Sequence, residues 1–150
     1  MKTQMKHIIT LFCIFVLCAG LTVPAGATNI NDIISIQSSD FLTYYAAYAL
    51  SRSGGEVIIE FEVDGTGRMD LVGSSYIVIQ EKSGSTWKGV STYFGSVSNG
   101  MLDDNAFSHI GSITYAGTLG KEYRALVTIY AEGSAGDDSR TVTTNTVTAR

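Results

Sequence analysis

Apolar and polar residues alternate along much of this chain, with the period of two that predicts half-buried β-strands. In the clearest segment, 56–63, every second residue is apolar, and the positions between them carry Ile58, Glu60 and Glu62. The expected core-facing residues of this segment are Val57, Ile59, Phe61 and Val63. The same alternation returns in 121–131. Its expected core-facing residues are Tyr123, Ala125, Val127 and Ile129.

Further strands are expected between turns that are rich in glycine, serine and aspartate. Segment 75–82 holds four apolar residues in a row, which predicts a strand covered on both faces. Segment 86–94 returns from a hairpin loop at 82–85, with Trp87 as an expected core residue. The remaining strands are expected at 33–37, 109–115 and 140–149, and the loops at 64–67, 95–107, 116–120 and 132–139.

The segment 40–51, DFLTYYAAYALS, fits both a helix and a strand. A helix would begin at Ser39 or Asp40 and end at the glycine pair 54–55. A strand is favoured, because a short isolated helix fits poorly into a chain of strands. The residues expected on one face of that strand are Leu42, Tyr44, Ala46, Tyr48 and Leu50.

These segments predict an all-β fold, because seven or so short strands follow one another without an internal repeat or a linker. We expect residues 28–150 to form a single domain, an antiparallel two-sheet β-sandwich of about seven strands.

Residues 1–27 have the order of a secretory signal peptide. A basic start is followed by about 14 apolar residues and by an A-x-A cleavage site at 25–27. A membrane span is one alternative, but it needs roughly 20 apolar residues. A lipoprotein signal at Cys18 is another, but Leu17 stands where such a signal carries a small residue. We therefore expect a cleaved leader and a secreted, extracellular protein with no membrane attachment.

Cleavage would remove both cysteines and the one proline, since Cys13, Cys18 and Pro24 all lie in the leader. Ten basic residues less Lys2 and Lys6 leave eight against fourteen acidic ones, a net charge of −6. No disulfide, thiol nucleophile or cysteine-based metal site is then available, and no cofactor is expected. An acidic chain without a basic cluster argues against nucleic acid as a partner.

In the stretch 119–149, Gly120 and then Tyr123 enter a strand of alternating small and β-branched residues, and a glycine-bearing loop and a Thr/Val strand follow. This pattern resembles the last two strands of fibronectin type III and immunoglobulin-like domains. The resemblance implies that the Tyr123 hydroxyl bonds back to the preceding turn, an arrangement called the tyrosine corner.

A second resemblance covers most of the chain after the leader. The segments that carry it are 64–73, 77–90, 99–105 and 115–127. Over these segments the chain is similar to small exported proteins of Gram-positive bacteria that form a domain family of unknown function. The similarity implies secretion and a β-sandwich, and it implies no activity.

Candidate catalytic groups are few. Glu60 and Glu62 share one strand face, roughly 7 Å apart, whereas glycoside hydrolysis needs two carboxylates across a substrate, so a solvated face is favoured. His109 is the only imidazole after the leader, and no G-x-S-x-G motif accompanies it. A position at the rim of a strand is therefore favoured for His109, and no catalytic residue is predicted.

Aspartates in expected loops are the best candidates for calcium. Asp64 and Asp70 stand six residues apart in a glycine-bearing segment, and Asp103 and Asp104 form the next best pair. Turn chemistry explains an Asp-Gly pair without a metal, so no metal site is predicted.

Exposed aromatic side chains on a β-sandwich can stack on sugar rings or anchor a protein interface. The candidate binding surface consists of Tyr44, Tyr45, Tyr48, Trp87 and Tyr93. We expect a secreted, non-enzymatic binding module whose ligand is a protein or a glycan. Two alternatives are a small secreted hydrolase that acts on extracellular or cell-wall carbohydrate, and a secreted effector or inhibitor.

Overall fold

The computed structural model describes residues 40–150. The predicted signal peptide at 1–27 and the predicted edge strand at 33–37 lie outside these residues. Within 40–150, no helix is long and apolar enough to cross a bilayer.

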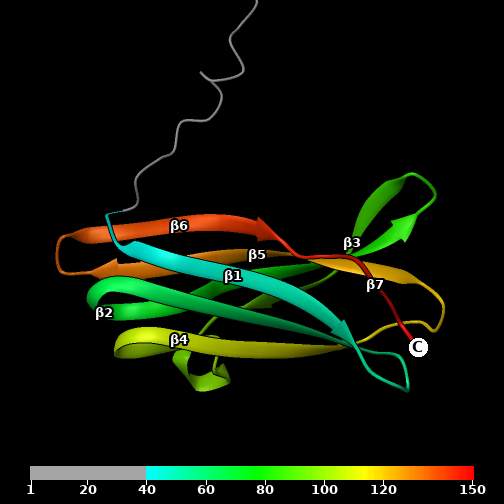
Figure 1. Cartoon of the computed structure of the whole chain (residues 1–150), viewed down its shortest axis with the longest axis horizontal. Helices are drawn as coiled ribbons and strands as arrows, with labels where there is room; N and C mark the ends of the chain where they lie inside the picture. The colour runs from blue at the N-terminus through cyan, green and yellow to red at the C-terminus, as the bar shows by residue number, and fades with distance from the viewer. Residues whose placement is uncertain (1–39) are drawn as a thin grey trace, which may run out of the picture. The chain divides into compact units, whose positions relative to one another are not determined.

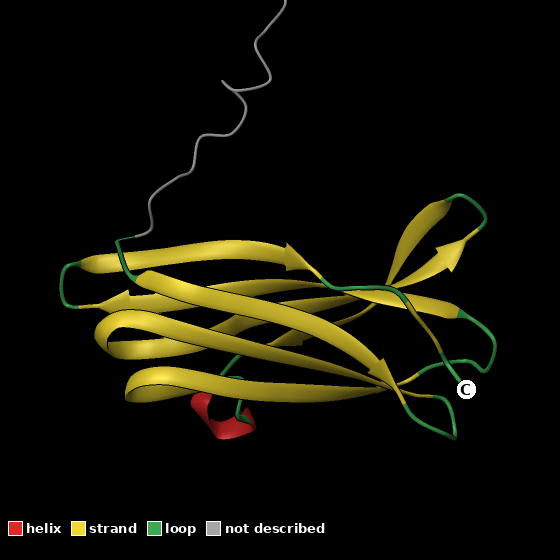
Figure 2. Ribbon diagram, in the orientation of Figure 1, coloured by secondary structure: helices red, strands yellow, loops and turns green. Residues whose placement is uncertain are grey.

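Residues 40–150 form seven strands, and every pair of neighbouring strands is antiparallel. The predicted all-β class and strand number are therefore confirmed, and the hydrogen bonds join the strands into one curled sheet (Figures 1 and 2). The elements are β1 (Leu42–Ser51), β2 (Glu56–Ser83), β3 (Thr86–Phe94), the 3₁₀ turn η2 (Val97–Asn99), β4 (Leu102–Ala116), β5 (Glu122–Gly133), β6 (Gly136–Thr143) and β7 (Val147–Thr148).

The curl comes from β2, which spans 28 residues and changes its partners halfway along. Its first half pairs with β1 and β4. Beyond the bend, β4 stays paired with β2 as far as Gly73, while β5 pairs from Leu71 onward and β3 from Tyr76 onward. Figure 1 shows β2 and β4 turning back at the same end of the sheet. The register against β4 shifts between Asp64 and Met69, as expected where a strand bends through a bulge. The loop predicted at 64–67 is therefore wrong, because these residues form the bend inside one strand.

The core lies inside this curl and takes the inward side chains of both halves of β2. Val57, Ile59, Phe61 and Val63 from the first half are fully buried, as the alternation predicts. From the second half Ile77 and Ile79 are fully buried, whereas Tyr76 is 40% exposed. The prediction of a strand covered on both faces is therefore wrong, because only one face of this half meets the core. The inward side chains of β5 complete the core; they are Tyr123, Ala125, Val127, Ile129 and Ala131.

The strand prediction for 40–51 is confirmed by β1, with one difference at its start. A register shift between Leu42 and Tyr44 buries Leu42, so this residue does not share a face with Tyr44 and Tyr48. A bulge adds one residue to one strand and thereby reverses the face on which the preceding side chain lies.

Two predicted loops are strands for part of their length. The segment 95–107 contains η2 and the start of β4, and the segment 132–139 contains a tight turn between β5 and β6. The strand predicted at 140–149 is divided into the end of β6 and the short β7. Polar and acidic residues fill these strand segments because β4 and β6 each lie along an edge, where one side faces water.

The half-buried Tyr130 on β5 makes the fold sensitive to high pH. Its hydroxyl donates a hydrogen bond of 2.8 Å to Glu132 Oε2, and burial together with this carboxylate raises the pKa of Tyr130 to about 12. The ordinary value is 10.0. Tyr130 holds its hydroxyl proton more tightly in the native state than in the unfolded chain. The resulting stabilisation of the native state is complete below pH 10.0 and is lost as the pH rises toward about 12.

We therefore expect the urea midpoint of the wild type to fall between about pH 10 and about pH 12. The urea midpoint of Tyr130→Phe should fall less over the same interval. At pH 8 the wild type and the variant should have similar urea midpoints. A variant that loses stability as steeply as the wild type would contradict this assignment.

Candidate functional site

Two exposed tyrosines mark the outer face of the sheet formed by β1, the first half of β2 and β4. Tyr44 is 49% exposed and Tyr48 is 42% exposed. The register places Tyr44 beside Asp64 and Tyr48 beside Glu60 on the neighbouring strand. Each ring thus lies next to a carboxylate on a surface that water can reach.

The carboxylates form a row along the outer face of β2. Glu60, Glu62 and Asp64 occupy every second position, so neighbours stand roughly 7 Å apart. None of the ion pairs formed by residues 40–150 includes any of the three. On the far side, β4 brings Ser108, Ile110 and Ser112 opposite them, and Ile110 is 73% exposed.

This outer face, which we call the tyrosine–carboxylate face, consists of Tyr44, Tyr48, Glu60, Glu62, Asp64 and Ile110. It carries negative charge between aromatic rings and an aliphatic side chain. Sequence reasoning identified its tyrosines but missed Ile110, whose exposure depends on the pairing of β4 with β2.

The other predicted aromatic residues lie elsewhere. Tyr45 points to the opposite side of β1 from Tyr44, since successive strand residues alternate. Tyr93 packs against the core, and its hydroxyl donates to the Thr114 carbonyl oxygen at 3.3 Å. The structure therefore brings together two of the five candidate binding residues.

Trp87 is half-buried on β3 and is not part of the core, which corrects the prediction of a core anchor. The Arg124 guanidinium lies over its ring at 4.4 Å and also donates to Gln80 Oε1 at 2.8 Å. This cation–π contact covers one face of the indole, so that face is not available to a ligand.

The calcium candidates lie in strands rather than in the loops expected for them. Asp64 and Asp70 belong to β2 on either side of its bend, and Asp103 and Asp104 belong to β4. The Asp103 carboxylate accepts the backbone N–H of Asp104 at 2.9 Å. Across residues 40–150 no group of three or more acidic, histidine or cysteine side chains is placed to hold a metal ion.

His109 is a half-buried residue that holds the turn at η2 against β4. Its ring lies 5.9 Å from the ring of Phe61, and Nε2 is 2.8 Å from the Gly100 carbonyl oxygen. Asp103 Oδ2 lies 3.9 Å from Nδ1. These contacts account for His109 as a structural residue at the rim of the core.

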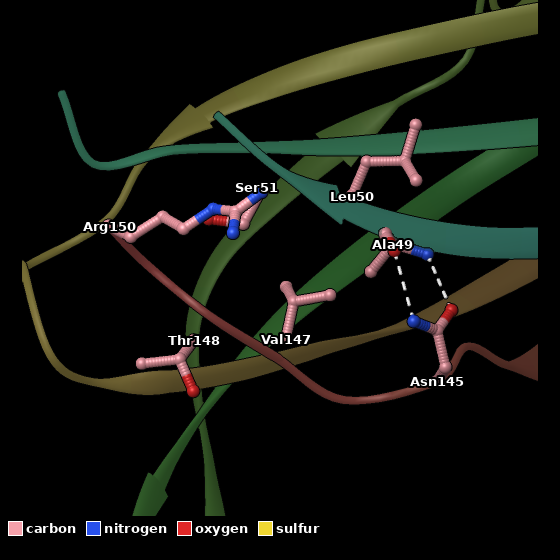
Figure 3. A pocket seen from close by; sticks show the side chains of 7 residues that line it. All are labelled: Ala49, Leu50, Ser51, Asn145, Val147, Thr148 and Arg150. Atoms are coloured by element: carbon pink, nitrogen blue, oxygen red, sulfur yellow. Dashed lines mark hydrogen bonds between the residues drawn. The ribbon is translucent and has the colours of Figure 1, made fainter. Parts of the chain in front are cut away.

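A pocket of about 470 Å³ opens between the end of β1 and the segment 145–150 (Figure 3). One end of the pocket is lined by Asn145, whose side-chain amide accepts the Ala49 N–H at 2.9 Å and donates to the Ala49 carbonyl oxygen at 3.0 Å. The amide thus satisfies the backbone of an edge strand as a neighbouring strand would.

The other end of the pocket is lined by Ser51 and Arg150. The backbone of this end is fixed, because the Gly55 N–H donates to the Arg150 carbonyl oxygen at 3.0 Å and Ala149 donates to Lys121 at 3.0 Å. Sequence reasoning missed this pocket, since no motif links residues about a hundred positions apart.

Comparison with known proteins found no family model, no curated protein and no solved structure that matches this chain. The resemblances to fibronectin type III domains and to exported Gram-positive proteins therefore stay predictions.

Proposed function

We propose that the chain is a secreted, non-enzymatic binding module built on an immunoglobulin-like β-sandwich. Two observations support the sandwich. The first half of β2 forms one group of strands with β1 and β4. The second half of β2 forms the other group with β3, β5 and β6. The Thr118 N–H donates to the Tyr123 hydroxyl at 2.9 Å, which is the contact with the preceding turn that the tyrosine corner requires.

The tyrosine–carboxylate face is the proposed binding surface, and the exposure of Tyr44 and Tyr48 beside unpaired carboxylates is the observation that carries the proposal. Tyrosine supplies a large contact area at little cost in side-chain entropy, which is why it is frequent in binding surfaces. The carboxylates can accept hydrogen bonds from sugar hydroxyls or from a protein partner. A protein or a glycan is therefore the proposed ligand.

The arrangement of Glu60 and Glu62 gives a hydrolase no comparable support. Both lie on the same face of one strand, two residues apart, whereas the two carboxylates of a glycosidase stand on opposite sides of the scissile bond.

We expect Tyr44→Ala/Tyr48→Ala to weaken ligand binding by roughly tenfold or more, because two aromatic contacts are lost at once. The purified protein after its leader would be applied to a glycan array and to fractionated cell-wall and supernatant proteins. Affinities of the wild type and the variant for each captured ligand would then be measured by biolayer interferometry.

The matched control is Phe94→Ala, which removes a side chain that is 75% exposed on β3, away from the tyrosine–carboxylate face. Its affinity should equal that of the wild type. Equal binding by all three proteins, or turnover of a captured glycan, would contradict the proposal.

A further inference from the structure

The Ser51 hydroxyl is a buried polar group without a partner. Among the side chains of residues 40–150 its Oγ atom is shielded from water and has no hydrogen bond. Such groups are rare in folded proteins, since each costs the desolvation of a donor and an acceptor. Ser51 also lines the pocket between β1 and segment 145–150, so the shielded hydroxyl belongs to a residue of the pocket wall.

Arg150 gives the same pocket a positive charge. The guanidinium takes part in none of the ion pairs of residues 40–150, while its own backbone is held by Gly55. Figure 3 shows the Arg150 side chain extending toward Ser51 from the opposite wall. An arginine that forms no ion pair suits a carboxylate, because its planar fork matches two carboxylate oxygens.

The rest of the pocket is mostly apolar. Val147 points from β7 into the space between the walls, and Ala49 lies beside Asn145 at one end (Figure 3). The Asn145 amide already bonds both backbone polar groups of Ala49. It is therefore not free to hold water at this apolar end of the pocket. The pocket thus has one cationic end and one aliphatic end.

We propose that this pocket binds a small monocarboxylate with a short aliphatic chain. Arg150 binds the two carboxylate oxygens, the Ser51 hydroxyl donates to one of them once its side chain rotates out of its shielded position, and Val147 contacts the aliphatic part. This site is separate from the tyrosine–carboxylate face, and its test does not depend on the proposed function. The same chemistry is offered by free short-chain acids and by the carboxylate at the end of a peptide.

The test is a titration of the protein with butyrate, followed through the methyl resonances of Val147 in NMR spectra. Butyramide, which has the same shape without the charge, is the matched ligand control. We expect butyrate to shift these resonances with a dissociation constant on the order of 1 mM, and butyramide to bind at least tenfold more weakly. The blocked dipeptide N-acetyl-Ala-Val distinguishes the sources: tighter binding than butyrate assigns a peptide end, and weaker binding assigns a free acid.

Three variants locate the site. Arg150→Gln and Ser51→Ala should each weaken butyrate binding by tenfold or more, whereas Arg52→Gln, which removes the neighbouring exposed arginine, should leave it unchanged. Ser51→Ala should also raise the melting temperature, since it deletes an unpartnered buried hydroxyl. Equal binding of butyrate and butyramide, no shifts at 50 mM butyrate, or unchanged binding by Arg150→Gln would overturn the proposal.

Discussion

Replacing Gly73 by alanine is expected to lower the free energy of unfolding by about 4 kcal/mol or more. Gly73 has a φ of 142°, which alanine adopts only with strain. A Cβ atom there would lie 2.3 Å from the Met101 carbonyl oxygen and 3.1 Å from the Leu102 Cα. Both atoms belong to backbone, so neither can move aside as a side chain could.

The position explains the size of the effect. At Gly73, β2 pairs with Leu102 of β4 on one side and with Tyr130 of β5 on the other. The next residue, Ser74, donates its N–H to the same Met101 carbonyl oxygen at 2.8 Å. Relief of the clash at Met101 would therefore disturb the hydrogen bond that holds the start of β4 against β2.

Urea denaturation followed by circular dichroism measures this loss, with Gly54→Ala as the matched control. Gly54 has a φ of 88°, but nothing lies within 4 Å of its missing Cβ. Gly54→Ala should therefore lower the free energy of unfolding by only about 1 kcal/mol, which is the strain of the backbone alone. Similar losses for both variants would show that the close approach at Gly73 does not hold the sheet together.

The inward faces of the strands could be predicted from sequence because burial follows a period of two. Phe61 and Val127 stand in unbroken alternation, and both are fully buried. The length of β2 could not be predicted in this way. Its bend contains Asp64 and Gly65, which are typical turn residues, and only the continued pairing with β4 makes the bend part of one strand.

The candidate site shows the same limit. Tyr48 and Glu60 are each visible in the sequence, but their position side by side depends on the register between β1 and β2. Trp87 is predicted as a core residue, whereas its half-buried ring lies outside the core and contacts Arg124 at 4.4 Å. Contacts of this kind join residues that are distant in sequence, and no local pattern encodes them.

The second large effect is expected at Tyr123, where Tyr123→Phe should lower the free energy of unfolding by about 2 kcal/mol, while leaving the shape of the core unchanged. The ring is fully buried, and its hydroxyl accepts the Thr118 N–H at 2.9 Å and donates to Glu81 Oε2 at 2.7 Å. Phenylalanine removes both bonds. The Thr118 N–H then lacks an acceptor, and the Glu81 carboxylate loses its closest donor.

A double-mutant cycle with Glu81→Ala, which removes the acceptor altogether, separates the two bonds, because residues that share a hydrogen bond give non-additive losses. We expect a coupling energy of about 1 kcal/mol between Tyr123→Phe and Glu81→Ala, the remainder belonging to Thr118. Tyr130→Phe is the control, since its hydroxyl bonds only Glu132 on the same strand, and it should cost less than about 1 kcal/mol at neutral pH. A Tyr123→Phe variant as stable as the wild type would mean that the packing of the ring, rather than its hydroxyl, fixes the turn before β5.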